Sequence, residues 1–71
     1  MTNKELLEQA IESSGIKISK LMEATKIKSY ATFRGRMNNE TEFTASEIQS
    51  ICSVLGLTAA QRNRIFFASN V

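Results

Sequence analysis

The side chains that could do chemistry in this chain gather in one short stretch, and their chemistry is charge pairing and hydrogen bonding. Six of the nine basic residues lie between Lys17 and Arg36, against a single acid, Glu23. This stretch carries a net charge of +5, whereas the residues before it carry −2 and those after it −1. A basic helical patch on a nearly neutral body indicates a phosphate-rich partner, with a solvated helix face as the alternative.

Several of these side chains are suited to double-stranded DNA. Arg34 can donate two hydrogen bonds to guanine, and Asn38 can pair with adenine if it reaches a base edge. Tyr30 can contact a thymine methyl group or donate to a phosphate, and packing against Phe33 is equally open. The expected base contacts are Ser29, Tyr30, Ala31, Arg34 and Asn38. The expected phosphate contacts are Lys17, Ser19, Lys20, Lys28, Arg36 and Asn39.

The same inventory argues against an enzyme. The chain has no histidine and no aspartate, and its one cysteine is Cys52. Neither a Ser-His-Asp nor a Cys-His arrangement can therefore be assembled. Glutamates alone make poor sites for soft metals, and the sequence has no glycine-rich phosphate loop. We expect no catalytic residue, no metal and no cofactor.

Length and composition predict one small all-α domain spanning residues 1–71. The chain is 42% hydrophobic and 23% charged, as in an ordinary folded domain. The absence of proline and the presence of only three glycines favour helices joined by short turns. A lone cysteine suits a reducing compartment, with Cys52 as a core thiol, and the sequence has no signal-peptide core or membrane-spanning apolar run. We expect a cytoplasmic protein without a membrane span.

The first half of the chain predicts three helices, of which the second and third form a helix-turn-helix. The predicted boundaries are a Thr2–Glu5 capping box and Gly15 for the first helix, Ile18 or Ser19 for the start of the second, and Lys28 or Ser29 to Asn38–Asn39 for the third. Leu21, Ile27, Phe33 and Met37 are spaced to anchor the third helix to a core. Gly35 lowers its helix propensity by about 1 kcal/mol, which indicates a helix that approaches another surface closely.

The second half predicts two further helices and an aromatic end. A Thr44–Glu47 capping box with a Phe43–Ile48 staple begins the fourth helix, Gly56 ends it, and a Thr58–Gln61 box begins the fifth. Phe66 and Phe67 lie about 100° apart on this last helix, so both cannot enter one small core. We expect an interface formed by Phe66 and Phe67, with Phe67 the more exposed ring.

From Thr2 to Phe67 the chain resembles the short repressor/Cro-like helix-turn-helix proteins of bacteria and their phages. The motif covers about residues 18–38, and the segment FTASEIQSICSVLGLTAAQRNRIFF resembles their last two helices. The motif departs from the family pattern at Met22, where alanine is usual, and at Lys26, where glycine is usual. One extra residue also separates Ile27 from Phe33. The resemblance implies a compact five-helix domain, binding of a double-stranded DNA operator as a homodimer, and transcriptional control of a phage or prophage switch.

A helix-turn-helix that binds protein is the alternative function. Proteins of the modulator-of-repression or antirepressor type occupy the DNA-binding domain of a phage repressor. Three features keep this alternative open: a net charge of only +2, the altered motif at Met22 and Lys26, and the aromatic end of the chain. A bare dimerisation module would leave the basic patch unexplained. The operator sequence, the host or phage origin and the direction of regulation stay open.

Overall fold

The computed structural model describes residues 1–67, and these form five helices and no strand. The helices are α1 (Lys4–Ser14), α2 (Ile18–Thr25), α3 (Tyr30–Met37), α4 (Ala45–Leu55) and α5 (Ala59–Phe66). The all-α, five-helix domain expected from the sequence is thereby confirmed. Within the described residues, no helix has the length and apolar character needed to cross a membrane.

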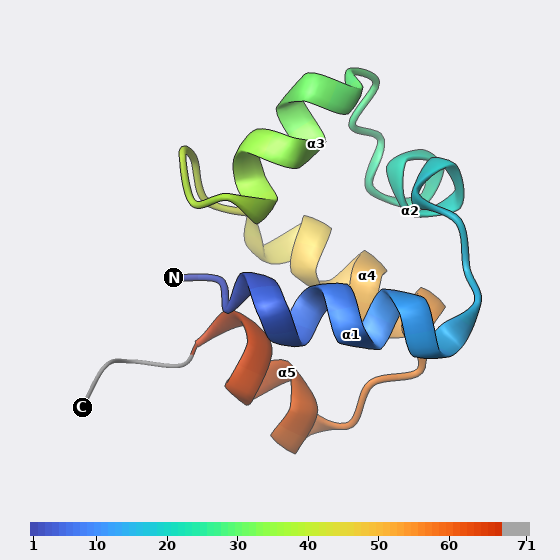
Figure 1. The fold of residues 1–71 in the computed structure, drawn as a ribbon, viewed down its shortest axis with the longest axis vertical. Helices are drawn as coiled ribbons and strands as arrows, with labels where there is room; N and C mark the ends of the chain where they lie inside the picture. Colours follow the sequence, from blue (N-terminus) through green and yellow to red (C-terminus); the bar gives the residue numbers. More distant parts are fainter. Residues whose placement is uncertain (68–71) are drawn as a thin grey trace.

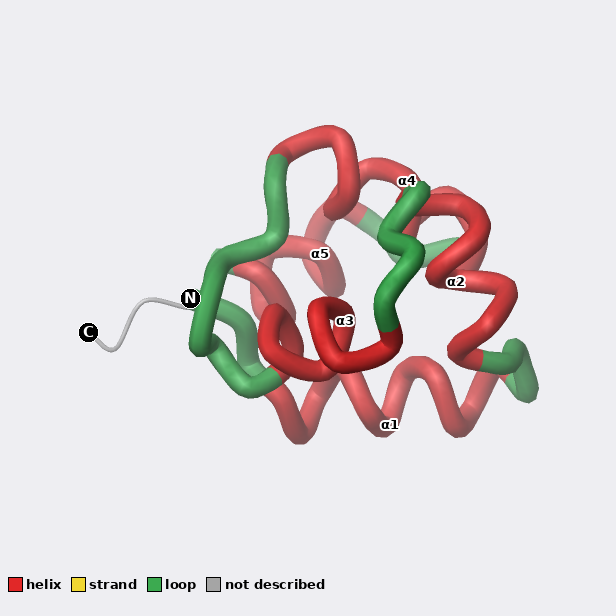
Figure 2. The backbone as a smooth tube through the Cα atoms, turned by 90° about the horizontal axis from the view of Figure 1, so that it is seen from above, coloured by secondary structure: helices red, strands yellow, loops and turns green. Residues whose placement is uncertain are grey.

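The helices surround one core, and α3 and α5 lie at opposite ends of the molecule (Figure 1). α1 crosses between these ends and packs against α5 and α4, while α2 packs chiefly against α4. Seen from above, α3 lies in front of the other helices, so one of its faces is open (Figure 2). The α2–α3 unit therefore forms one end of the domain.

Three phenylalanine rings connect the two ends through the core. The Phe43 ring meets Phe33 of α3 edge-on, with centroids 5.6 Å apart, and meets Phe66 of α5 at 5.7 Å. Such edge-to-face pairs add about 0.5–1.5 kcal/mol each beyond the area they bury. Leu21 and Ile51 are fully buried beside them. The position of α3 therefore depends on side chains from α2, α4, α5 and the loop before α4.

The predicted start of α1 is wrong by one residue. Asn3, and not Thr2, is the N-cap, because the Asn3 Oδ1 atom accepts a hydrogen bond from the Leu6 amide at 3.1 Å. Thr2 is buried, and its backbone N–H and C=O both bind the Asn39 side chain at 2.8 Å. This contact between distant residues removes Thr2 from the capping position.

The other predicted helix ends are confirmed. Ser29 caps α3 by accepting from the Thr32 amide, and Thr44–Glu47 and Thr58–Gln61 form complete capping boxes at α4 and α5. Gly15 and Gly56 end α1 and α4 with φ of 71° and 67°. These positive φ values are the left-handed conformation that glycine adopts without strain.

The turn between α2 and α3 contains an unusual lysine. Lys26 has φ 64° and ψ 21°, and its amide donates to the carbonyls of Glu23 and Met22. A non-glycine residue pays roughly 1–2 kcal/mol for this left-handed conformation. The next residue, Ile27, is 6% exposed and packs into the core, as predicted. Lys26 thus occupies the conformation that a turn glycine would occupy, at some cost in stability.

Candidate nucleic-acid interface

α3 turns one face into the core and leaves the other open. Phe33 and Met37 are buried, and they fix the rotation of the helix about its axis. At 3.6 residues per turn, Tyr30, Arg34 and Asn38 lie in a row beside this buried face. The predicted base contacts Ser29, Tyr30, Ala31 and Arg34 are all exposed, and Asn38 is half-buried at the C-terminal end. The structure thus places Tyr30, Ala31, Arg34 and Asn38 on one side of α3 and Ser29 at its N-terminal end, where the Ser29 hydroxyl caps the helix.

Arg34 and Tyr30 contact each other on this open face. The Arg34 Nη1 atom donates to Tyr30 Oη at 3.4 Å, and the guanidinium carbon lies 5.9 Å from the centre of the tyrosine ring. The hydrogen bond to Tyr30 is the main cause that raises the pKa of Arg34, so the guanidinium is charged at every physiological pH. A bond of this length is weak, and a base edge or a phosphate can replace it. Tyr30 is 54% exposed, so its ring is not part of the core.

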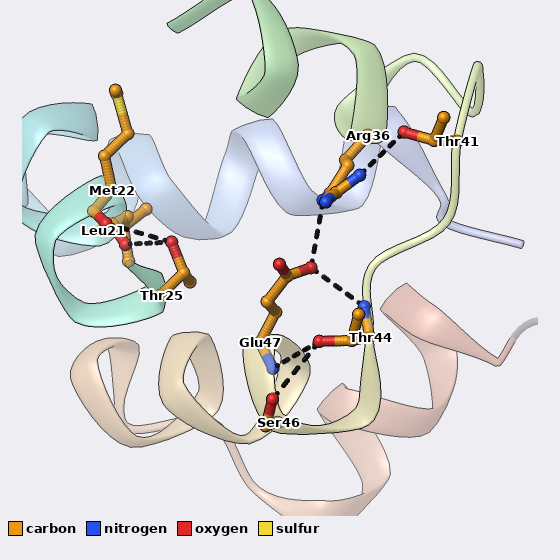
Figure 3. A network of polar contacts seen from close by, with 8 residues as sticks. All are labelled: Leu21, Met22, Thr25, Arg36, Thr41, Thr44, Ser46 and Glu47. Carbon is orange, nitrogen blue, oxygen red and sulfur yellow. Dashed lines mark hydrogen bonds and ion pairs between the residues drawn. The ribbon is translucent and has the colours of Figure 1, made fainter. Parts of the chain in front are cut away.

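Arg36 does not share the open face with Arg34. Its side chain points from α3 toward α4, where Nε lies 3.0 Å from Glu47 Oε1 and Nη1 donates to Thr41 Oγ1 at 3.0 Å (Figure 3). The arginine and glutamate side chains are only 21% and 12% exposed. The same Glu47 oxygen accepts from the Thr44 amide at 2.9 Å, as part of the α4 capping box. The prediction that Arg36 contacts phosphate is therefore corrected: Arg36 joins α3 to α4.

Asn39 also has an internal partner. It adopts φ 64°, and its side-chain amide makes both hydrogen bonds to the Thr2 backbone. Releasing it to reach a phosphate would leave the buried Thr2 without these partners, at a cost of about 1–3 kcal/mol. Asn39 is therefore corrected from a phosphate contact to a tie between the end of α3 and the start of the chain.

Gly35 is buried because the turn after α3 covers it, so the close approach inferred from its small size occurs inside the molecule. Its carbonyl accepts from the Glu40 amide at 2.8 Å as the chain turns back after the helix. A Cβ added at Gly35 would lie 3.4 Å from Glu40 Oε1, an ordinary contact with a flexible side chain. The glycine therefore does not serve an external ligand.

The remaining predicted phosphate contacts surround the start of α2 and of α3. Lys17, Ser19, Lys20 and Lys28 are all exposed. Lys17 occupies the N-cap position of α2 and its side chain makes no capping hydrogen bond, so the first α2 amides are available to an anion. Lys20 forms an exposed ion pair with Glu23 at 3.4 Å, which contributes little and can exchange for a phosphate.

The two C-terminal rings have different environments. Phe66 is 3% exposed and packs edge-on against Phe43, so the prediction that it forms an interface is corrected. Phe67 is 56% exposed, as expected from the spacing. It lines a small apolar hollow with Met1, Ala45 and Ile48. An exposed apolar surface of this kind is therefore available beside the end of α5.

Cys52 faces the core only in part. Burial raises the pKa of its thiol, so the reactive thiolate is disfavoured at neutral pH. Within residues 1–67, no three histidine, cysteine, aspartate or glutamate side chains gather as a metal site would require.

No family model matches the chain, and neither does any curated protein or solved structure. The resemblance to the repressor/Cro-like proteins, which rests on the helix-turn-helix stretch and the last two helices, stays a prediction.

Two features of the site were not foreseen from the sequence. Glu8 and Glu12 of α1 line a groove with Tyr30 and Arg34, although the basic stretch and the acidic first helix lie apart in the chain. Their i, i+4 spacing indicated a shared helix face, but only the packing of α1 beside α3 places this face next to Arg34. The ion pair of Glu47 with Arg36 was also not predicted, because the capping box at α4 already accounted for a glutamate at this position.

Proposed function

We propose that the chain is a sequence-specific DNA-binding regulator of transcription that inserts α3 into the major groove. The observation that carries this proposal is the open face of α3, where Tyr30 and Arg34 project from a helix that is held in place by Phe33, Met37 and Arg36. A rigid helix with an open polar face is what base readout requires, because only such a helix places donors reproducibly against base edges.

The basic groups around α2 support the same proposal. Lys17, Ser19 and Lys20 lie at the N-terminal end of α2, and Lys28 lies just before α3. Phosphate contacts at these positions would fix the register of α3 without carrying sequence information. By resemblance, the regulated process would be a phage or prophage switch.

A homodimer is part of this proposal. Apart from Tyr30, the exposed large apolar side chains of the described residues are Met1 and Phe67. Both described ends of the chain lie at one edge of the molecule in Figures 1 and 2. A two-fold axis at this edge, parallel to the view of Figure 2, keeps both α3 helices on the same side. To read two successive major grooves, the two α3 helices of such a dimer would have to lie about one turn of B-DNA apart, roughly 34–36 Å.

The position of Arg36 supports a competing function, which is binding to the DNA-binding domain of another protein. Because Arg36 faces α4, the open side of α3 keeps only Lys28 and Arg34 as cations. Tyr30 and Arg34 are also among the residue types most common at protein hot spots. An acidic protein surface could therefore use the same face.

Selection from a pool of random duplexes, followed by gel shifts, tests the two functions. Under the proposed function, a defined sequence is enriched, and its affinity falls steeply between 50 and 200 mM salt because several phosphates are neutralised. Failure to retain any duplex even at low salt would contradict the proposed function and favour a protein partner.

A further inference from the structure

A groove of about 450 Å³ separates α1 from α3, and Arg34 forms part of its rim. Lys4, Glu8 and Glu12 line its α1 side, and Tyr30 and Arg34 line its α3 side. The apolar side chains between them are Ile11, Ile18 and Met37. Arg34 therefore shares this groove with two carboxylates and one lysine.

Lys4 lines the same groove, but it forms no ion pair with either carboxylate. Glu8 and Glu12 are exposed, and no lysine or arginine nitrogen of residues 1–67 lies within 4.0 Å of either carboxylate. Glu8 is close enough to contribute, after the larger effect of Tyr30, to the raised pKa of Arg34. With Lys4 counted, the α1 side of the groove carries a net charge of −1, whereas the α2 flank carries Lys17 and Lys20.

We propose that Glu8 and Glu12 are specificity-determining residues that repel the DNA phosphates from the α1 flank of α3. A phosphate could otherwise satisfy Arg34 from this side with any DNA sequence, as a simple charge contact. With the flank negative, Arg34 gains most by turning toward a guanine edge. This inference rests on the proposed function, because it concerns how the same face discriminates among duplexes.

The expected effect is larger for random DNA than for the selected site. Random sequences are held mainly through phosphates, so removing a nearby negative charge strengthens this mode most. For Glu8→Gln we expect affinity for a random-sequence duplex to rise roughly threefold at low salt, and for Glu8→Gln with Glu12→Gln up to roughly tenfold. Affinity for the selected duplex rises less, so the ratio of the two affinities falls. The gain shrinks at high salt because the repulsion is screened.

Glu5→Gln is the matched control for this experiment. Glu5 is also exposed on α1 and changes the net charge equally, but it does not line the groove. It should alter both affinities less than Glu8→Gln does. Helical circular dichroism of each variant verifies that α1 still folds.

A second comparison uses the Arg34→Ala background. Because the carboxylates repel phosphates directly, part of the gain on random DNA should persist without Arg34, and only the part that comes from a phosphate binding Arg34 should be lost. Complete disappearance of the gain would overturn the proposal, because it would show that Glu8 and Glu12 act on Arg34 alone and do not repel DNA phosphates. An equal rise on both duplexes, or no change on either, would also overturn it while leaving the proposed function intact. If the unmodified protein retains no duplex of any sequence, the proposed function and this inference fall together.

Discussion

Arg34 and Arg36 are two residues apart in the chain, yet they have different environments in the structure. Arg34 is exposed and forms a hydrogen bond with Tyr30, whereas Arg36 is largely buried between Glu47 and Thr41. The helical spacing places them about 200° apart around α3, so only one of them can face outward. Replacing each by alanine therefore separates DNA recognition from stability.

Arg34→Ala should lower affinity for the selected duplex by roughly tenfold to a hundredfold and relax preference at one base pair, because a bidentate guanine contact is lost. The midpoint of urea unfolding should not change. Gel shifts on selected and random duplexes measure the effect. Equal losses on both duplexes would identify Arg34 as a phosphate contact, and no loss on either would show that the open face of α3 is not used.

Arg36→Ala should instead lower the free energy of unfolding by about 1–3 kcal/mol, because it leaves the Glu47 carboxylate poorly solvated beside α4. Urea denaturation followed by circular dichroism measures this change. Arg36→Lys keeps the charge but not the second donor to Thr41, so it should recover only part of the loss. A variant as stable as the unmodified protein would show that the ion pair makes no net contribution.

At the scale of the helices, the two glycines of α1 and α3 offer a direct comparison. Gly35→Ala should stabilise the protein by about 0.5–1 kcal/mol, because alanine is the better helix former and its Cβ makes only an ordinary contact with Glu40. Gly15→Ala should destabilise it by about 1 kcal/mol, because Gly15 has φ 71°. Thermal unfolding of both variants measures the pair. Loss of stability in Gly35→Ala would show that the turn at Glu40 cannot adjust.

The helices themselves were predictable because their ends carry local signals. Thr44, Thr58 and Gly56 act on amides and carbonyls within a few residues, so their roles follow from sequence spacing alone. Thr2 carried the same local signal, but its backbone is taken by Asn39, which is distant in the chain. Arg36 and Glu8 were misjudged or missed for the same reason: their partners lie on other helices, and no sequence pattern encodes which helix faces become neighbours.

At the scale of the whole molecule, the edge that carries Met1 and Phe67 is the expected dimer contact. Phe67→Ser should lower the apparent mass in analytical ultracentrifugation while leaving the helical circular dichroism intact, because the ring is exposed in the single chain. Phe66→Ser is the contrasting change and should unfold the core, since Phe66 packs against Phe43. A protein that is monomeric at high micromolar concentration before either change would exclude a stable dimer without DNA.

The first residues of the chain are held at two distant places. Thr2 binds Asn39, just after α3, and the Asn3 amide donates to the Ile65 carbonyl of α5 at 2.6 Å. Chain ends usually fray and exchange their amide hydrogens quickly. Here the beginning of the chain can detach only if the ends of α3 and α5 both lose a partner. We therefore expect this terminus to open mainly when the whole domain unfolds, and hydrogen-exchange measurements should find the Thr2 and Asn3 amides among the slowly exchanging hydrogens.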